Sequence, residues 1–171
     1  MTDFVHLHVH SDFSLLDAAV SVMDLADKAE ELGMKYLALT DHGNMFGTME
    51  FIKACGETVN ENGRHEKRKK PVKPIIGCEV YVCSGSRFDK NGSESENRYY
   101  HLVMLAANRK GYFNLAKLCS LAYIDGFSCF SSQRYLHNLY ILIANLRLLS
   151  SGMFKNIFSL LFAICYLLCN I

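Results

Sequence analysis

Three histidines alternate with two apolar residues in the run HLHVH at residues 6–10. Side chains along a β-strand point alternately to the two faces of a sheet, so a strand over residues 4–10 places all three imidazoles on one face. Such imidazoles can bind one metal ion or bridge two, and Asp17 in the following turn could add a carboxylate oxygen. A half-exposed strand is the simpler interpretation of any one of these histidines. An alternating triplet followed by acids favours a metal site.

A helix and a second strand follow, which gives the sequence a β-α-β rhythm. Ser21 is placed to cap a helix whose apolar residues recur at helical spacing as far as Leu32, and Gly33 is a typical helix stop. The apolar run at residues 35–40 is of strand length and ends in Asp-His-Gly at residues 41–43. This order predicts parallel strands joined by right-handed crossovers, with sites at the carboxyl ends of strands. His42 lies at such an end, either as a ligand or as a buried capping histidine.

Later segments repeat the pattern of one ligand-type residue on each strand. The remaining expected elements are a helix at 47–59, a strand at 74–83, a strand at 99–107 and a helix at 108–122. Glu79 interrupts an apolar strand, and a buried carboxylate costs several kcal/mol unless it is paired or binds a metal. On an edge strand it could instead face solvent. Together with His101, these residues form a mixture of imidazole and carboxylate that suits Zn²⁺, Mn²⁺ or Fe²⁺. Clusters of such ions hydrolyse phosphoesters by activating a water molecule.

Charge and cysteine content narrow the choice of partner and compartment. The formal net charge is +1, so no overall field indicates a nucleic-acid partner. A basic segment at residues 60–74 could contact phosphates, but it is short and has no aromatic residue for stacking, which favours a solvated surface loop. Seven cysteines without a C-x-x-C pair predict reduced thiols rather than disulfides or a zinc ribbon. With no signal peptide at the start, we expect a cytoplasmic protein.

The composition changes abruptly after residue 127. All 17 acidic residues lie at or before Asp125, and residues 128–171 contain no acid, no proline and three basic residues. Our interpretation is an out-of-frame or degenerate end of the coding sequence. The alternative is a membrane anchor, but the apolar run at residues 157–169 has 13 residues, whereas a spanning helix needs about 20. We therefore expect no membrane segment.

Four segments carry a resemblance to a known family: HLHVHSDFSLLD, LALTDHGNMFG, KPIIGCEVYV and HLVMLAANRKGYFNLAKL. They closely resemble the polymerase and histidinol phosphatase (PHP) domain, and more narrowly the N-terminal PHP domain of bacterial DNA polymerase III alpha subunits. The resemblance covers residues 3–127, and the L-A-A-N-x-x-G-Y-x-N-L pattern points to the polymerases. It implies an α/β fold, a distorted (βα)7 barrel, with a di- or trinuclear Zn²⁺ or Mn²⁺ site at the strand ends. The metal ligands that it implies are His8, His10, Asp17, His42, Glu79 and His101. We expect His6 and Asp41 to lie next to these ligands without binding the metal themselves.

The later barrel strands of the family, with a further histidine and an Asp-x-His pair, have no counterpart in this sequence. We therefore expect an incomplete barrel at residues 1–127 and a non-homologous, apolar, helical tail at residues 128–171. With those ligands missing, weak metal affinity and little or no phosphodiester hydrolysis follow.

The resemblance also implies a larger assembly. Full-length relatives are DNA-directed DNA polymerases of DNA replication, which work with DNA, a proofreading exonuclease subunit and a sliding clamp. No palm domain that would hold the polymerising Mg²⁺ is recognised in these residues, so we expect no polymerisation by this chain alone. The alternatives are a stand-alone metal-dependent phosphoesterase and a structural module that binds a partner.

Overall fold

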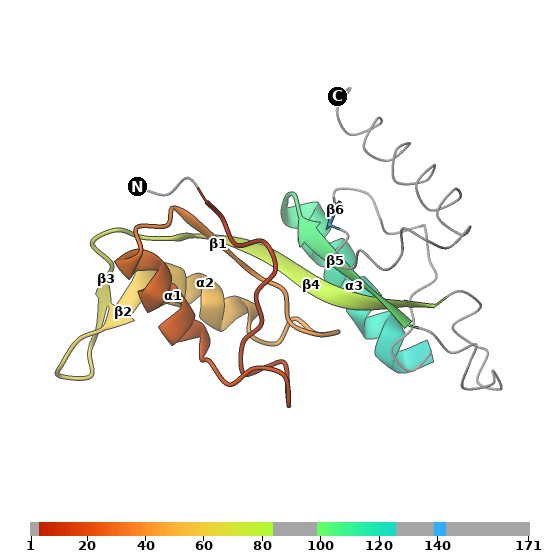
Figure 1. The fold of residues 1–171 in the computed structure, drawn as a ribbon, viewed down its shortest axis with the longest axis horizontal. Helices are drawn as coiled ribbons and strands as arrows, with labels where there is room; N and C mark the ends of the chain where they lie inside the picture. The colour runs from red at the N-terminus through yellow and green to blue at the C-terminus, as the bar shows by residue number, and fades with distance from the viewer. Residues whose placement is uncertain (1–3, 84–98, 126–138, 143–171) are drawn as a thin grey trace, which may run out of the picture.

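The computed structural model describes residues 4–83, 99–125 and 139–142 and has a mixed α/β fold (Figure 1). It contains a four-stranded sheet in the order β1-β4-β5-β6 and a separate two-stranded hairpin, β2-β3. The elements in chain order are α1 (Val22–Glu31), β1 (Tyr36–Leu39), α2 (Thr48–Gly56), β2 (Glu57–Val59), β3 (His65–Lys67), β4 (Lys73–Cys83), β5 (Tyr99–Ala106), α3 (Arg109–Asp125) and β6 (Leu139–Leu142). Within the described ranges, no helix is both long and apolar enough to cross a membrane.

Helix α1 begins and ends where its capping residues predict. The Ser21 side chain accepts a hydrogen bond from the backbone N–H of Asp24 at 3.1 Å, and its hydroxyl donates to the Asp24 carboxylate at 2.7 Å. At the other end Gly33 has a φ of +70°, which a residue without Cβ adopts freely. The N–H groups of Gly33 and Met34 donate to the carbonyls of Glu30 and Ala29, the pattern of a Schellman cap. The predicted helix is confirmed.

Strand β4 runs along the length of the molecule and pairs differently in its two halves (Figure 1). Its first residues lie parallel to β1, with Lys73 opposite Tyr36 and Ile76 opposite Leu39. From Gly77 onward it is antiparallel to β5. The expectation of parallel strands throughout is therefore wrong for β5. A parallel return needs a crossover, usually a helix, and the sequence at residues 84–98 is polar and has no helical apolar period.

Residues 4–10 lie along the other edge of β1 but do not form a regular strand, contrary to prediction. The N–H of Ala38 donates to the His6 carbonyl at 3.0 Å, and the N–H of Thr40 donates to the Val9 carbonyl at 2.8 Å. The bonded positions are three residues apart on this segment but two apart along β1 and the residue after it, so one extra residue interrupts the ladder. The Thr40 hydroxyl fills the gap, since it accepts from the Val9 N–H at 2.9 Å and donates to the Val9 carbonyl at 3.0 Å.

The described buried apolar residues form three clusters, two of which lie toward opposite ends of β4. One lies between α1, α2 and β1 and includes Phe51 and Cys55, and another lies between α3, β4 and β5 and includes Met104 and Leu115. Figure 1 shows the same division, with α1 and α2 at one end of β4 and α3 at the other. Not every apolar residue of α2 packs into these clusters, because Met49 is 69% exposed.

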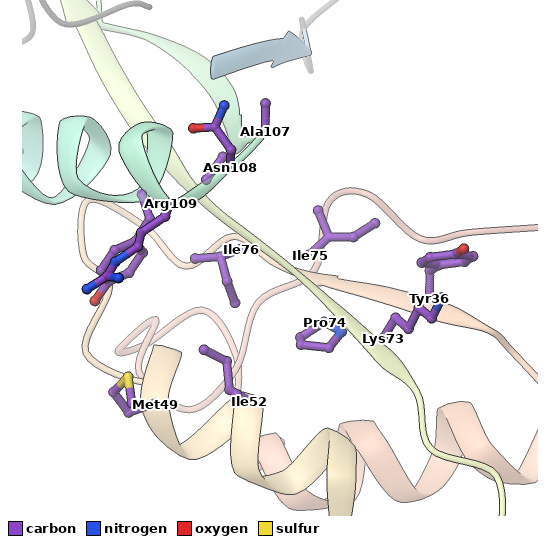
Figure 2. A pocket seen from close by; sticks show the side chains of 12 residues that line it. Tyr36, Met49, Ile52, Lys73, Pro74, Ile75, Ile76, Ala107, Asn108 and Arg109 are labelled. Carbon is purple, nitrogen blue, oxygen red and sulfur yellow. The ribbon is translucent and has the colours of Figure 1, made fainter. Parts of the chain in front are cut away.

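An open groove lies between α2 and the start of α3, over the first four residues of β4 (Figure 2). Its lining includes Met49 and Ile52 of α2, Ile75 and Ile76 of β4, and Tyr112 of α3. It contains none of the six predicted metal ligands, so their chemistry lies elsewhere on the molecule.

The basic segment at residues 60–74 is not a solvated loop throughout. It contains β3, which pairs with β2, and helix α2 ends at Gly56, earlier than predicted, because the chain turns into this hairpin. The Arg68 guanidinium is buried and lies 2.7 Å from the Asp27 carboxylate and 2.9 Å from the Glu30 carboxylate. It also donates to the Ala54 carbonyl at 2.5 Å. Arg68 therefore connects the hairpin to α1 and α2 and is a buried, not a solvated, basic residue.

Strand β6 lies beyond the predicted boundary at residue 127. It pairs antiparallel with β5, with Leu139 opposite Ala106 and Leu142 opposite Val103. These four residues are a strand, whereas a helical tail was expected. The rest of the predicted tail lies outside the described residues.

Candidate metal centre

The candidate centre is built where the chain following β1 runs beside the middle of β4. The N–H of Glu79 donates to the Asp41 carbonyl at 3.0 Å, and the N–H of Gly43 donates to the Glu79 carbonyl at 2.8 Å. These two bonds flank an isolated parallel bridge between His42 and Glu79. The predicted ligands of two successive strands thus become neighbours through backbone pairing alone.

Asp41 anchors the loop that carries Asp17. It is 1% exposed, and its carboxylate accepts hydrogen bonds from the Ser11 N–H at 2.6 Å, the Ser11 hydroxyl at 2.9 Å and the Ser14 hydroxyl at 2.7 Å. The Ser14 oxygen in turn accepts from the His42 N–H at 3.1 Å. The Asp41 carboxylate is thus satisfied by one backbone N–H and two serine hydroxyl groups, which supports a structural role beside the ligands.

One group of ligand atoms is formed by His8, His10 and Glu79. The Nε2 atoms of His8 and His10 lie 2.9 Å apart. The Oε2 atom of Glu79 lies 2.5 Å from His8 Nε2 and 2.8 Å from His10 Nε2. The two histidines share a face, as alternation predicts, even though the ladder beside them is interrupted.

The other nitrogen of His10 belongs to a second group, with Asp17 and His42. The Oδ2 atom of Asp17 lies 2.7 Å from His10 Nδ1 and 3.3 Å from His42 Nε2. The His10 imidazole therefore stands between the two groups, with one nitrogen directed to each.

A third group joins His42, Glu79 and His101. His42 Nδ1 lies 3.7 Å from Glu79 Oε2, and His101 Nδ1 forms a close contact with Glu79 Oε1. His101 comes from β5, where it lies opposite Tyr81 of β4. The two carboxylate oxygens of Glu79 thus face different ligand sets, which is the arrangement of a bridging carboxylate.

The distances fit a divalent cation after a small outward movement of the side chains. Ligand atoms about 2.0–2.1 Å from a tetrahedral ion are about 3.3 Å from one another. The separations of 2.5–2.9 Å in the group of His8, His10 and Glu79 are about 0.4–0.8 Å shorter. Imidazole and carboxylate are also the ligand types of Zn²⁺ and Mn²⁺ sites. The described residues therefore provide a candidate metal centre with the right donors.

Burial and charge differ among the six groups. Glu79 is 2% exposed and lies at the base, whereas the Asp17 side chain is 53% exposed at the rim. Burial raises the pKa of Glu79, but the hydrogen bond with His8 and the charges of His42, His8 and His101 outweigh it, so the net shift is downward. The hydrogen bond with His10 lowers the pKa of Asp17. Both carboxyl groups therefore favour the ionised form that binds a cation.

The pKa of His42 is lowered, chiefly because burial disfavours the charged imidazolium, against the opposing effect of the Glu79 carboxylate. A neutral imidazole is the form that ligates a metal ion. The surroundings of His42 therefore favour the neutral imidazole, which can bind a metal ion, over the buried imidazolium.

Tyr81 also belongs to the centre, and the sequence reasoning missed it. Its hydroxyl lies 3.4 Å from His42 Nδ1, its ring is stacked on His42, and it meets His101 edge to face at a centroid distance of 4.8 Å. Burial, followed by the charge of Glu79, raises the pKa of Tyr81. The missed signal was the strand period, because Tyr81 is two residues after Glu79 and so shares its face.

His6 lies apart from the three ligand groups in the described structure. It is exposed, its ring meets the Phe4 ring edge to face at 4.7 Å, and its carbonyl accepts from Ala38. Its predicted supporting role stays a prediction.

Comparisons with known proteins agree with the resemblance seen in the sequence. A family model described as PHP domain matches residues 6–164. The chain is 50% identical over 123 residues to the DNA polymerase III subunit alpha of Treponema pallidum (strain Nichols), which covers 72% of this chain and 10% of that protein. It is 45% identical over 124 residues to the DNA polymerase III subunit alpha of Borreliella burgdorferi, again covering 72% of this chain and 10% of the relative.

Among solved structures, a Bifidobacterium adolescentis protein assigned as a metal-dependent phosphoesterase is similar at 18% identity and a TM-score of 0.44. That match covers 68% of this chain and 32% of the other. The chain spans about a tenth of the length of the curated relatives that it matches. Since the family match extends over most of the sequence, the predicted resemblance is confirmed, and the chain belongs to the PHP domain family.

Proposed function

We propose that this chain is the N-terminal PHP portion of a bacterial replicative DNA polymerase III alpha subunit, and that its six candidate ligands bind two or three divalent cations, Zn²⁺ or Mn²⁺. The observation that carries the proposal is the sharing of ligands. His10, His42 and Glu79 each belong to two of the three groups, so neighbouring ions would be held by common side chains.

Ions bound there would act as Lewis acids and lower the pKa of a bound water molecule, which is the chemistry of phosphoester hydrolysis. Glu79 and the histidines around it would hold the ions, with Glu79 as the carboxylate common to two of the ligand groups. Asp17 at the exposed rim would leave the centre open to a substrate. Tyr81, stacked on His42, would fix the orientation of that imidazole.

The proposed architecture is an incomplete (βα)7 barrel with an apolar tail. The family ligands expected from later strands have no counterpart in the sequence. We therefore expect weak metal affinity and little or no turnover.

At the level of the whole relative, the proposal implies DNA-directed DNA polymerase activity with DNA, a proofreading exonuclease subunit and a sliding clamp as partners, in the cytoplasm. The chain spans only about a tenth of those relatives. By itself it would supply the metal-binding module of that assembly rather than the polymerising site.

Metal analysis tests the proposal. The purified chain is stripped with chelator, and its bound metal is then measured by equilibrium dialysis against saturating Zn²⁺ or Mn²⁺, so that weak sites are also filled. Glu79→Gln and the control Glu50→Gln, whose side chain is exposed on α2, are measured beside it. We expect at least two bound ions per chain for the wild type and the control, and loss of more than one ion in Glu79→Gln. Absence of stoichiometric metal in the wild type would contradict the proposal.

Hydrolysis of bis(p-nitrophenyl) phosphate separates the module from an independent enzyme. We expect little or no turnover by the reconstituted chain. Rapid turnover that His8→Ala abolishes would instead identify a competent phosphoesterase.

The boundary at residue 127 is proposed as a change in the coding sequence rather than as the end of the fold. The loss of acids begins there, yet β6 extends the sheet further along the chain. The nucleotide sequence for about a kilobase past the codon for Phe127 tests this. A shifted frame that continues as a polymerase supports the proposal, and one intact frame in independent isolates would overturn it.

A further inference from the structure

Leu16 adopts a backbone conformation that leucine rarely adopts. Its φ is +66°, and it is the one non-glycine residue with a positive φ across residues 4–83, 99–125 and 139–142. A side chain with a Cβ is disfavoured in this left-handed region because it approaches the following carbonyl. Such conformations persist where the surroundings enforce them, often at functional sites.

Side-chain packing does not explain the conformation. The Leu16 side chain is fully exposed, and its neighbour Leu15 is 84% exposed. The constraint must therefore come from the backbone on either side of Leu16.

The backbone forms a tight turn that begins at Ser14. The Ser14 carbonyl accepts from the Asp17 N–H at 3.0 Å and from the Ala18 N–H at 3.1 Å. Leu16 is the third residue of the turn from Ser14 to Asp17, a position where type II turns require a positive φ and usually carry glycine or asparagine. Ser14 itself is fixed by Asp41 and the His42 N–H. The start of the turn is thus rigid, and Leu16 sets the direction in which the chain leaves it.

Asp17 is the residue whose position depends on this direction. Its side chain is half exposed, and its carboxylate lies 2.7 Å from His10 Nδ1 and 3.3 Å from His42 Nε2. We propose that Leu16 is a positioning residue, whose left-handed backbone conformation holds the Asp17 carboxylate in the metal-ligand group with His10 and His42. This inference rests on the proposed metal-binding function.

Three substitutions at residue 16 separate backbone conformation from side-chain chemistry. Leu16→Gly and Leu16→Asn accept a positive φ, whereas the β-branched Leu16→Val resists it more than leucine does. Leu15→Val is the matched control, because it makes the same change at an exposed neighbour without a positive φ. We expect Mn²⁺ affinity, measured by calorimetry, to fall about three- to ten-fold in Leu16→Val, since a smaller fraction of molecules holds the binding conformation. Affinity stays at the wild-type value or rises in the glycine, asparagine and control variants.

A double-mutant cycle shows whether the effect acts through Asp17. In an Asp17→Ala background, Leu16→Val should cause no further loss of affinity. An equal additional loss would overturn the inference.

Amide hydrogen exchange of the metal-free protein gives a readout that does not depend on metal. In Leu16→Val, exchange at the Asp17 and Ala18 amides should accelerate, while the thermal midpoint stays unchanged. If wild type binds metal but Leu16→Val matches it in affinity and exchange, the inference fails and the proposed function stands. If wild type binds no metal, the proposed function fails, and the inference with it.

Discussion

Glu79 combines the deepest burial among the six candidate ligands with the largest number of ligand neighbours. A carboxylate that is 2% exposed is destabilising unless its charge is matched. Here both of its oxygens lie within hydrogen-bonding distance of imidazole nitrogens. The same contacts that offset its burial also direct its lone pairs toward the positions where cations would bind.

Asp41 has a different role, and its replacement should affect folding stability directly. Asp41→Asn removes the charge that accepts three hydrogen bonds from Ser11 and Ser14. The amide oxygen can still accept the two bonds made to Oδ1, but the bond made to Oδ2 loses its acceptor. A hydrogen bond to a charged group contributes about 1.5–3 kcal/mol, so we expect the free energy of unfolding of the metal-free protein to fall by about 2–3 kcal/mol. Urea denaturation measures it. Asp12→Asn, at an exposed position in the same loop, is the control, and an equal loss in both variants would argue against the structural role.

For single residues, the sequence predicts a role that the residue's own neighbours in the chain reveal. It does not predict a role that depends on a residue far away in the chain. Glu79 was predicted because an acid in an apolar strand needs a partner. Ser11 and Ser14 gave no such signal, because serine is ordinary in a loop. Their burial follows only from the approach of Asp41, which is distant in sequence.

At the level of elements, Arg68 joins the β2-β3 hairpin to helix α1 through its contacts with Asp27 and Glu30. Its guanidinium is buried. A substitution that removes one partner therefore leaves a buried charge unpaired, which destabilises the fold more than breaking a surface ion pair does. The hydrogen bond from Arg68, followed by that from the Lys70 N–H, lowers the pKa of Glu30 below its ordinary value of 4.5.

This shift predicts a pH-dependent contribution to stability. A carboxyl with a lower pKa in the folded state stabilises the fold above its unfolded pKa, and the stabilisation is lost as the pH falls through the folded value. We expect Glu30→Gln to lower the free energy of unfolding by about 1.5–3 kcal/mol near neutral pH, with the difference shrinking steadily below pH 4.5.

Urea denaturation of both proteins at several pH values measures the difference. Glu31→Gln is the matched control, because Glu31 is 65% exposed and pairs with Lys28 on the surface, where a pair contributes at most about 1 kcal/mol. A Glu30→Gln effect that is the same at every pH would contradict the assignment.

The elements that the sequence predicted well are those fixed by neighbours in the chain. Helix α1 follows from its caps, Ser21 and Gly33, and from the helical spacing of the apolar residues between them. The pairing of β5 with β4 and the interrupted ladder beside β1 depend on partners far along the chain, such as Thr40 with Val9. Periodicity predicts that a strand exists but not the direction or register of its partner.

At the level of the whole molecule, backbone pairing brings ligands from separate segments to one place. The loop after β1, the middle of β4 and the start of β5 contribute His42, Glu79 and His101, while residues 4–17 supply the remaining three. The predicted set thus comes together, although β5 runs antiparallel to β4. The ligands need only lie on neighbouring strands, and either parallel or antiparallel pairing can bring them together.

Anomalous X-ray diffraction from crystals of the chain reconstituted with Zn²⁺ tests the central claim most directly, because it locates each ion relative to its ligands. We predict at least two peaks, one about 2.0–2.2 Å from ligand atoms of His8, His10 and Glu79, and another within the same distance of ligand atoms in a neighbouring group. Zinc bound only at surface histidines such as His65, with no peak among these side chains, would contradict the account.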